Sequence, residues 1–297
     1  MLGKTDGVIL HAGGKHVDRI EDLGIILKTQ RYHDRDLIVS AFTEKNGRIS
    51  AFARNAIQSR RFGSALDPTT ASELSFGGRS IKLTDFTEDS LLSLESAEPR
   101  KVFSQLSKDI ERLGIASFFC EIVLKTTMKM RPYPDLFRLL GHGLDLANEK
   151  ETHSRNLISL GCTFLYKLLQ THGAQPKITR CLRCELSLTE IPQTFVHPQP
   201  VDGGWACSAC SDRSTGDRRG DPVPVSIFME WLPTITESIR NYSRNLGNTE
   251  TLPLFQFLLE HTRFHVPGAG DSVIQSLTFI PGVDGKPLIN PPQPSLT

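Results

Sequence analysis

The sequence predicts an α+β protein with a small N-terminal β-barrel, an all-α helical domain and a four-cysteine metal-binding insertion. Three observations predict this arrangement. Between residues 24 and 94, short runs of aliphatic and aromatic residues alternate with turn residues, as in a sheet of short strands. From Pro99 onward, apolar residues recur at helical spacing. Two Cys-x2-Cys pairs, which begin at Cys181 and Cys207, interrupt the helical part.

Five short strands are expected in the N-terminal part. A hairpin is expected at Asn46-Gly47, because a tight hairpin turn favours two residues that accept positive φ. Five strands within about 70 residues favour a small barrel over an open sheet with crossover helices. The expected strands are 24–30, 37–43, 48–54, 71–76 and 80–84, with a turn at Gly77-Gly78 and with 91–94 as an extension of the last strand.

The helical part begins where Phe103, Leu106, Ile110 and Leu113 share one face of a helix. Gly114 is expected to end that helix, and Pro233 is expected to separate two later ones, because glycine and proline disfavour a helix interior. The helices expected after Gly114 are 115–130, 134–148, 154–172, 225–232, 235–246 and 252–265.

These patterns divide the chain into six segments. Residues 1–22 are an N-terminal extension with one short strand at 7–11, and residues 281–297 are a tail with five prolines. The segments between them are the barrel at 23–96, a first helical part at 97–178, the cysteine insertion at 179–222 and a second helical part at 223–280.

The composition excludes several classes of protein. The 297 residues include 38% hydrophobic and 23% charged residues, which is typical of a folded globular protein. Apolar runs are only a few residues long, far below the ~18 that a membrane span needs. No secretory leader is recognisable, so we expect a cytoplasmic protein that does not contact a membrane.

The two Cys-x2-Cys pairs predict a metal site. Each pair forms a turn that directs two thiolates to one point, and four sulfur ligands suit tetrahedral Zn²⁺. With four protein ligands the metal has no open position, so we expect one structural zinc ion. The alternative is two pairs of reduced or redox-active thiols. The predicted ligands are Cys181, Cys184, Cys207 and Cys210, whereas Cys120 and Cys162 stand in apolar contexts typical of buried, inert thiols.

The barrel segment is more basic than the whole chain. Residues 24–82 contain ten Lys or Arg and five Asp or Glu, a balance of +5, whereas the chain has a net charge of +1. Alternation along strand 48–54 places Arg48, Phe52 and Arg54 on one face. Cations interleaved with aromatic rings are typical of a platform for single-stranded nucleic acid. The alternative is the solvated face of an ordinary barrel.

A resemblance to a known family joins these features. The residues that carry it are the stretch from Gly24 to Val39, Phe42-Thr43, Gly47-Arg48, Ala53-Arg54, Arg60-Arg61 and Leu66 to Pro68, together with the position of the four cysteines between helices. Their order and spacing resemble the RecO family, bacterial DNA repair proteins of the RecF recombination pathway. The resemblance extends from about residue 22 to about residue 270.

The resemblance implies an N-terminal OB-fold, a helical C-terminal domain and an embedded zinc finger. It implies binding to single- and double-stranded DNA, annealing of complementary strands, and help in loading the recombinase RecA onto strands coated by single-strand-binding protein. The implied partners are RecR, the acidic C-terminal tail of single-strand-binding protein and, indirectly, RecF and RecA. The implied location is the bacterial nucleoid. The DNA-binding residues predicted on this match are Lys28, Arg31, Arg35, Arg48, Phe52, Arg54, Arg60, Arg61 and Arg79.

No catalytic residue is predicted, because no group of residues has the pattern of an acid–base pair, a nucleophile with its base, or a phosphate-binding glycine loop. Two other functions are compatible with the sequence. One is an RNA-binding or transcription-associated protein with an OB-fold and a zinc ribbon. The other is a hydrolase that holds a metal at His261 and His265, although the Glu of the metalloprotease pattern does not follow His261.

Overall fold

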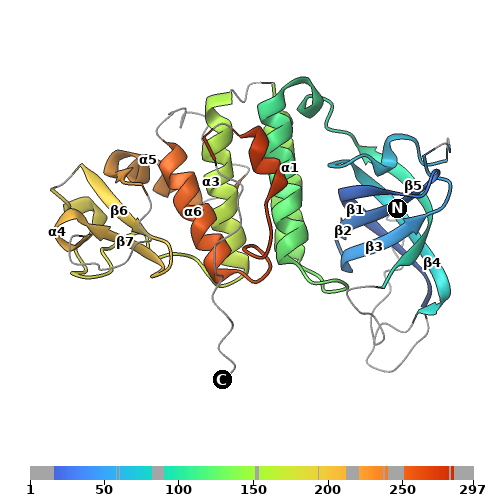
Figure 1. Ribbon diagram of the computed structural model, residues 1–297, viewed down its shortest axis with the longest axis horizontal. Helices are drawn as coiled ribbons and strands as arrows, with labels where there is room; N and C mark the ends of the chain where they lie inside the picture. The colour runs from blue at the N-terminus through green and yellow to red at the C-terminus, as the bar shows by residue number, and fades with distance from the viewer. Residues whose placement is uncertain are drawn as a thin grey trace, which may run out of the picture.

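The computed structural model describes residues 17–57, 59, 61–81, 90–150, 154–192, 194–211, 221–236, 238–239, 251–280 and 282–283. The barrel lies at one end of an elongated molecule, the helices lie in the middle, and the cysteine insertion lies at the other end (Figure 1). The strand expected at 7–11, most of the helix expected at 235–246 and nearly all of the tail lie outside the described residues.

Five strands close into the barrel, which confirms the predicted architecture. They are β1 (Val17–Tyr32), β2 (Asp36–Thr43), β3 (Gly47–Ala53), β4 (Ala71–Ile81) and β5 (Leu92–Lys101). Their order around the barrel is β1-β2-β3-β5-β4. All neighbours are antiparallel except β3 and β5, which pair in parallel at Ala51 with Leu92 and at Phe52 with Ser93. A short 3₁₀ turn, η1 (Gly63–Leu66), lies between β3 and β4.

The strand bounds correct three sequence-based expectations. β1 begins at Val17, inside the segment assigned to an extension. β4 continues through Gly77, where a turn was expected, and 92–101 forms the fifth strand instead of an extension. A Cβ at Gly77 would lie 1.9 Å from Oε1 of the partly exposed Glu95 side chain on β5, which would have to turn aside. A glycine that looks like a turn signal can therefore lie within a continuous strand.

The β2–β3 hairpin forms at the predicted place with a different turn. Only Gly47 has a positive φ (+71°) in this turn, which runs through Glu44, Lys45 and Asn46. The buried carboxylate of Asp22 on β1 holds it, because Asp22 Oδ2 accepts hydrogen bonds from Lys45 N (3.0 Å), Asn46 N (3.1 Å) and Asn46 Nδ2 (2.8 Å).

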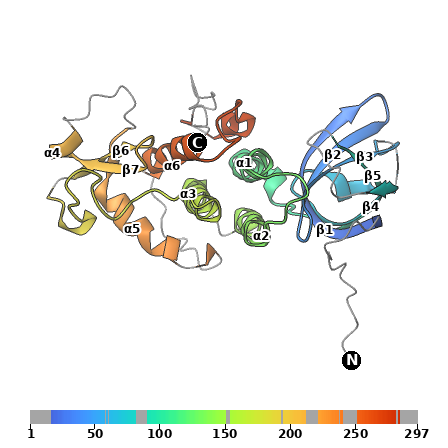
Figure 2. The ribbon, with the colours of Figure 1, turned by 90° about the horizontal axis from the view of Figure 1, so that it is seen from below.

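The helical domain contains α1 (Ile110–Thr126), α2 (Pro134–Asn148), α3 (Ser154–Thr171), α5 (Val225–Thr236) and α6 (Leu252–His265). Figure 2 views α1, α2 and α3 nearly end-on between the barrel and the cysteine insertion. Two short 3₁₀ segments, η3 (Leu106–Lys108) and η7 (Gln275–Phe279), pack against α1.

Two predicted helix breaks are absent. Helix α1 begins at Ile110, after an Asp109 cap that accepts hydrogen bonds from Glu111 N and Arg112 N, and it continues through Gly114. A Cβ on Gly114 would lie 2.8 Å from Phe279 Cβ, so this glycine admits η7. Helix α5 contains Pro233. Tertiary packing outweighs the local cost of glycine in α1, which is about 1 kcal/mol.

The cysteine insertion is a small module of its own. Its three-stranded sheet has the order β7-β6-β8, from β6 (Phe195–Gln199), β7 (Gly204–Cys207) and β8 (Val223–Pro224). The 3₁₀ turn η4 (Leu188–Glu190) precedes the sheet, and the one-turn helix α4 (Ser208–Ser211) follows β7. Trp205, Cys181 and Cys207 belong to the same buried cluster as the helices, so the module shares its core with the helical domain.

Candidate metal centre and nucleic-acid interface

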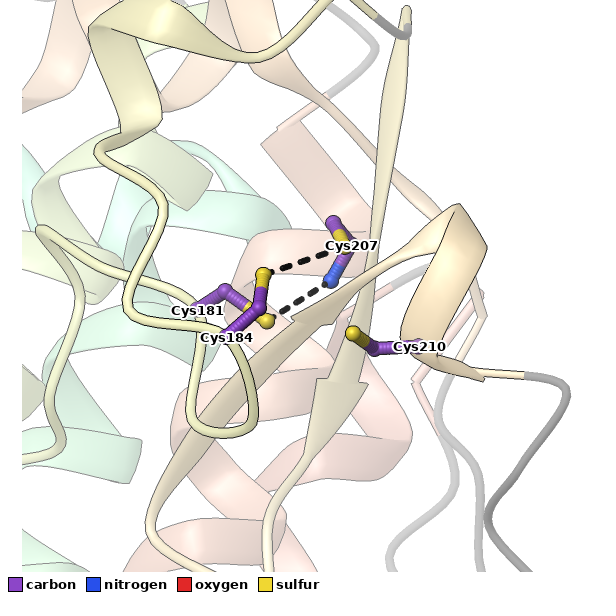
Figure 3. A group of neighbouring side chains, drawn as sticks. All are labelled: Cys181, Cys184, Cys207 and Cys210. Atoms are coloured by element: carbon purple, nitrogen blue, oxygen red, sulfur yellow. Dashed lines mark hydrogen bonds between the residues drawn. The ribbon is translucent and has the colours of Figure 1, made fainter.

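The four predicted cysteines come together at one point. Their Sγ atoms all lie within 4.8 Å of one another, although two come from the turn after residue 180 and two from β7 and α4 (Figure 3). Cys184 Sγ and Cys207 Sγ are 3.8 Å apart. Sulfurs at about 2.3 Å from a tetrahedral zinc ion stand about 3.8 Å from each other. The cluster therefore has the spacing of a four-sulfur metal site.

The backbone around the cluster favours thiolates. Arg183 N and Cys207 N direct their hydrogens at Cys181 Sγ, at 3.5 and 3.4 Å. Burial alone would raise the pKa of Cys181, but these amide contacts and that of Cys184 lower it to about 7. The crowding of thiols has the opposite effect on Cys210, whose pKa is raised to about 12, chiefly through its contact with Cys207. A bound cation would relieve that repulsion, so the donor set fits a metal.

The remaining two cysteines behave as expected for core residues. Cys120 lies on α1 and Cys162 on α3, both buried and outside the four-cysteine cluster. Burial raises the pKa of Cys120 to about 12 and raises that of Cys162 further. Neither thiol is poised to react or to bind a metal.

His261 and His265 on helix α6 contact the cysteine module. His261 is buried, and its ring nitrogens lie 3.0 Å from the carbonyl oxygen of Pro200 and 2.7 Å from that of Ala174. His265 Nε2 lies 2.9 Å from the same Pro200 oxygen. Burial lowers the pKa of His261. These backbone contacts leave the nitrogens directed at carbonyl groups, which argues against the metal-dependent hydrolase.

The outer face of β1, β2 and β3 is divided into two halves. In one half, Ile25, Leu27 and Phe42 belong to the core of the helical domain, and the Phe42 ring lies 6.0 Å from that of Phe137 on α2. The inward face of the same strands fills the barrel with Ile26, Val39, Ala41, Ile49 and Ala51. The helices therefore cover the half of the outer face that contains Ile25 and Phe42.

The other half of the outer face, which we call the platform, carries Lys28, Tyr32, Ile38, Phe52 and Arg54. Cross-strand pairing aligns Gln30 with Ile38 and Ile38 with Phe52, and alternation along β1 places Lys28 and Tyr32 on the same face as Gln30. Arg54 directly follows the end of β3. The Tyr32 and Phe52 rings meet edge to face, 5.7 Å apart, and Tyr32 is 45% exposed. Lys28 and Arg54 are exposed. The platform therefore combines two aromatic rings with two exposed cations.

The other predicted DNA-binding residues are distributed unevenly. Arg31, Arg35 and Arg61 are exposed, and Arg61 lies over the Phe62 ring at 5.4 Å. Arg48 is half-buried, and its Nε donates to the carbonyl of Thr127 at 3.0 Å, so it lies at the joint with the helical domain. Arg60 lies outside the described residues, and the side chain of Arg79 is not described.

Sequence reasoning missed Tyr32. The expected first strand ended at Gln30, whereas β1 continues to Tyr32. The signal was present, because Lys28, Gln30 and Tyr32 recur at the two-residue spacing of one strand face.

The comparisons with known proteins agree with this arrangement. Residues 17–98 match the family described as "Recombination protein O N terminal", and residues 107–230 match "Recombination protein O C terminal". A protein of Alkaliphilus metalliredigens named DNA repair protein RecO is 30% identical over 247 residues, which are 82% of this chain and 93% of that protein. The chain belongs to the RecO family.

Other relatives with the name DNA repair protein RecO show the same similarity. That of Syntrophus aciditrophicus is 31% identical over 205 residues, which are 69% of this chain and 73% of the relative. That of Anaeromyxobacter sp. strain K is 29% identical over 198 residues, which are 66% and 72%. The two matched RecO regions coincide with the barrel and with most of the helical domain and module. Among the described residues of this RecO-family chain, no helix is long and apolar enough to cross a membrane.

Proposed function

We propose that this chain is a DNA repair and recombination mediator without a catalytic step. It binds single- and double-stranded DNA, anneals complementary strands and helps to load RecA onto strands coated by single-strand-binding protein. The observation that carries the proposal is the platform of Tyr32 and Phe52 with Lys28 and Arg54, on a chain of the RecO family.

The chemistry of the platform suits a single strand. Bases stack on aromatic rings with about 1–3 kcal/mol per base, in a way that tolerates any sequence. Lysine and arginine neutralise phosphates and release counterions. Annealing needs no bond to be made or broken by the protein. A cationic surface reduces the repulsion between two strands and raises their local concentration, so that base pairing itself supplies the driving force.

We propose Zn²⁺ as the ion at the four cysteines, in a structural role. Soft thiolates in a closed tetrahedral set select zinc and leave no position for a substrate or water. The residues that would hold it are Cys181, Cys184, Cys207 and Cys210. The ion would tie the turn after residue 180 to β7, and so fix the module against α3 and α6.

We propose that the acidic C-terminal tail of single-strand-binding protein binds in a cleft of the helical domain. This cleft has a volume of about 410 Å³ and is lined by apolar, polar and charged side chains. Leu139 and Ile239 are its apolar lining residues, and Arg138 and Lys167 are its cationic ones. Arg138 also forms an ion pair with Asp135, which lines the same cleft. The complete lining is Asp135, Arg138, Leu139, His142, Lys167, Gln170, Thr171, Ser238 and Ile239.

A peptide that copies this tail is expected to bind the full-length protein with a micromolar dissociation constant. Arg138→Glu should weaken the binding at least tenfold, because it removes a cation from the cleft and adds a repulsive charge. Fluorescence anisotropy of a labelled peptide measures both values. Lys108→Glu, on the exposed 3₁₀ turn before α1, is the matched control. Equal binding by wild type and Arg138→Glu would rule out this cleft as the site.

RecR, and indirectly RecF and RecA, are the further proposed partners, at the bacterial nucleoid in the cytoplasm. In this proposal, RecR binds this protein, and the cleft of the helical domain binds the tail of single-strand-binding protein.

The proposed function is tested by annealing. Two complementary labelled oligonucleotides should pair several times faster with the protein than without it, measured by energy transfer, both as bare strands and when coated with single-strand-binding protein. The acceleration should diminish as salt rises, because phosphate contacts are screened and counterion release loses its advantage. No acceleration at low salt, or a strong preference for RNA strands over DNA, would favour the RNA-binding alternative instead.

A further inference from the structure

The connection between α1 and α2 lies along the edge of β3. Arg48 Nε donates to Thr127 O at 3.0 Å, and Met130 N donates to Arg48 O at 3.0 Å. Arg48 also forms a parallel β-bridge with Lys129. This bridge extends the short parallel pairing of β3 with β5, which ends at Ala51. The connection therefore continues the barrel sheet on the side that faces the helical domain.

The hairpin tip touches the same connection. A Cβ on Gly47 would lie 1.8 Å from Arg131 O, so the two backbones are in contact at this glycine. The side chains of Lys45 at the tip and Arg131 on the connection are both exposed. We call Lys45, Lys129 and Arg131 the connection surface.

This surface is cationic. Residues 127–131 contain Lys129 and Arg131 and no acidic residue, and the hairpin tip adds Lys45 with a single Glu44 beside it. Lys129 is half-buried, and its Nζ donates to Ser90 O at 3.2 Å. Within the part of the chain that the structure describes, neither Lys45 nor Arg131 forms an ion pair. The Arg131 guanidinium lies over the Tyr133 ring at 5.6 Å, which orients it while the charge stays exposed.

Lys129 lies on the same sheet face as the platform. Residues that pair directly across strands project to the same side, so Lys129 lies on the side of Arg48, and Arg48 alternates onto the side of Phe52 and Arg54. Six residues of strand, at about 3.3 Å each, put Arg48 about 20 Å from Arg54. A single-stranded nucleic acid whose bases stack on the platform would reach the connection surface within a few nucleotides.

We infer that the connection surface is a second phosphate-binding surface for the same nucleic-acid strand. This inference rests on the proposed function. The chemistry indicates the backbone of the strand as the ligand: the exposed groups are cations, and the aromatic ring here, that of Tyr133, is covered by Arg131. The surface therefore adds affinity and length to the binding site without sequence preference.

The test compares a short and a long single strand on the full-length protein. The variant Lys45→Gln/Arg131→Gln removes two exposed charges, and anisotropy measures binding of a 6-nucleotide and a 30-nucleotide oligonucleotide. The platform alone accommodates about six nucleotides, near the lower end of sites on OB-folds. We expect about tenfold weaker binding of the 30-mer and unchanged binding of the 6-mer. The slope of log K against log salt for the 30-mer should fall by about 1.4, or 0.7 for each lost phosphate contact.

Two further variants serve as controls. One tests whether the loss of binding comes from charge or from packing, and the other tests whether it comes from the net charge of the protein. Arg131→Lys keeps the cation and should bind the 30-mer nearly as well as wild type. Lys108→Gln/Lys150→Gln removes two exposed charges near the ends of α1 and α2 that lie away from the connection. The 17 residues of α1 span about 25 Å. This variant should leave the affinities for both oligonucleotides unchanged.

Unchanged binding of the 30-mer by the double variant, or an equal loss for both oligonucleotides, would overturn the inference. Failure of the proposed function looks different, because the wild-type protein itself would then bind neither oligonucleotide.

Discussion

Cys184→Ser is expected to abolish stoichiometric metal binding and to unfold the module. Three sulfurs hold Zn²⁺ far more weakly than four, and structural zinc contributes about 10–16 kcal/mol of apparent binding free energy in small zinc domains. Trp205, Cys181 and Cys207 are fully buried together with the helices, so the loss should extend into the packing of α3 and α6. Native mass spectrometry should show one zinc per chain for wild type and none for the variant.

The matched control for this prediction is Cys120→Ser. Cys120 is buried on α1, outside the cluster, so this change disturbs a core residue but removes no ligand. The control should keep one zinc per chain even where its melting temperature falls. If Cys184→Ser retains one tightly bound zinc, the proposed ligand set is wrong. If wild-type protein holds no metal and forms disulfides instead, the redox-thiol alternative takes its place.

Lys28→Glu/Arg54→Glu is expected to weaken single-strand binding by more than about 100-fold. Each charge-assisted hydrogen bond contributes about 1.5–3 kcal/mol, and 1.4 kcal/mol corresponds to a tenfold change in affinity. Both side chains are exposed, so the fold should persist. Anisotropy across a salt titration should also show a slope smaller by about 1.4. Lys108→Glu/Lys150→Glu changes the net charge equally and should leave binding nearly intact.

Tyr32→Ala separates stacking from charge on the same platform. Loss of one stacked base contact should cost about 1–3 kcal/mol of binding and leave the salt slope unchanged, because no phosphate contact is removed. Wild-type affinity in both the charge-reversal variant and Tyr32→Ala would move the DNA-binding surface away from the platform.

Much of the fold was predictable because local patterns and tertiary contacts agree. Alternation in strand 48–54 identified the inward residues of β3, and Pro134 at the first helical position marked the start of α2. Three of the errors occur at Gly77, Gly114 and Pro233. Local propensity makes each a breaker, yet α1 continues through Gly114, where a Cβ would lie 2.8 Å from Phe279 Cβ. Nothing in the contacts of Pro233 explains its place inside α5.

The sequence predicted both the four-cysteine cluster and the basic barrel strands. Two Cys-x2-Cys turns are typical of a four-sulfur metal site, and their spacing alone predicted that the four thiols would come together. The basic character and the alternation of the barrel strands were equally legible from the sequence. By itself, the sequence thus determined the four-cysteine cluster, the barrel and the basic character of its strands.

Tertiary structure alone decided which part of that face is accessible. A strand pattern shows that Phe42, Arg48, Phe52 and Arg54 point outward, but it does not show that α2 and the connection after α1 cover the first two. That covering depends on side chains more than 75 residues later in the chain, which bury Phe42 and leave Tyr32 exposed. Burial of apolar surface between distant segments, which no local pattern records, therefore divides the barrel face into a joint and a platform.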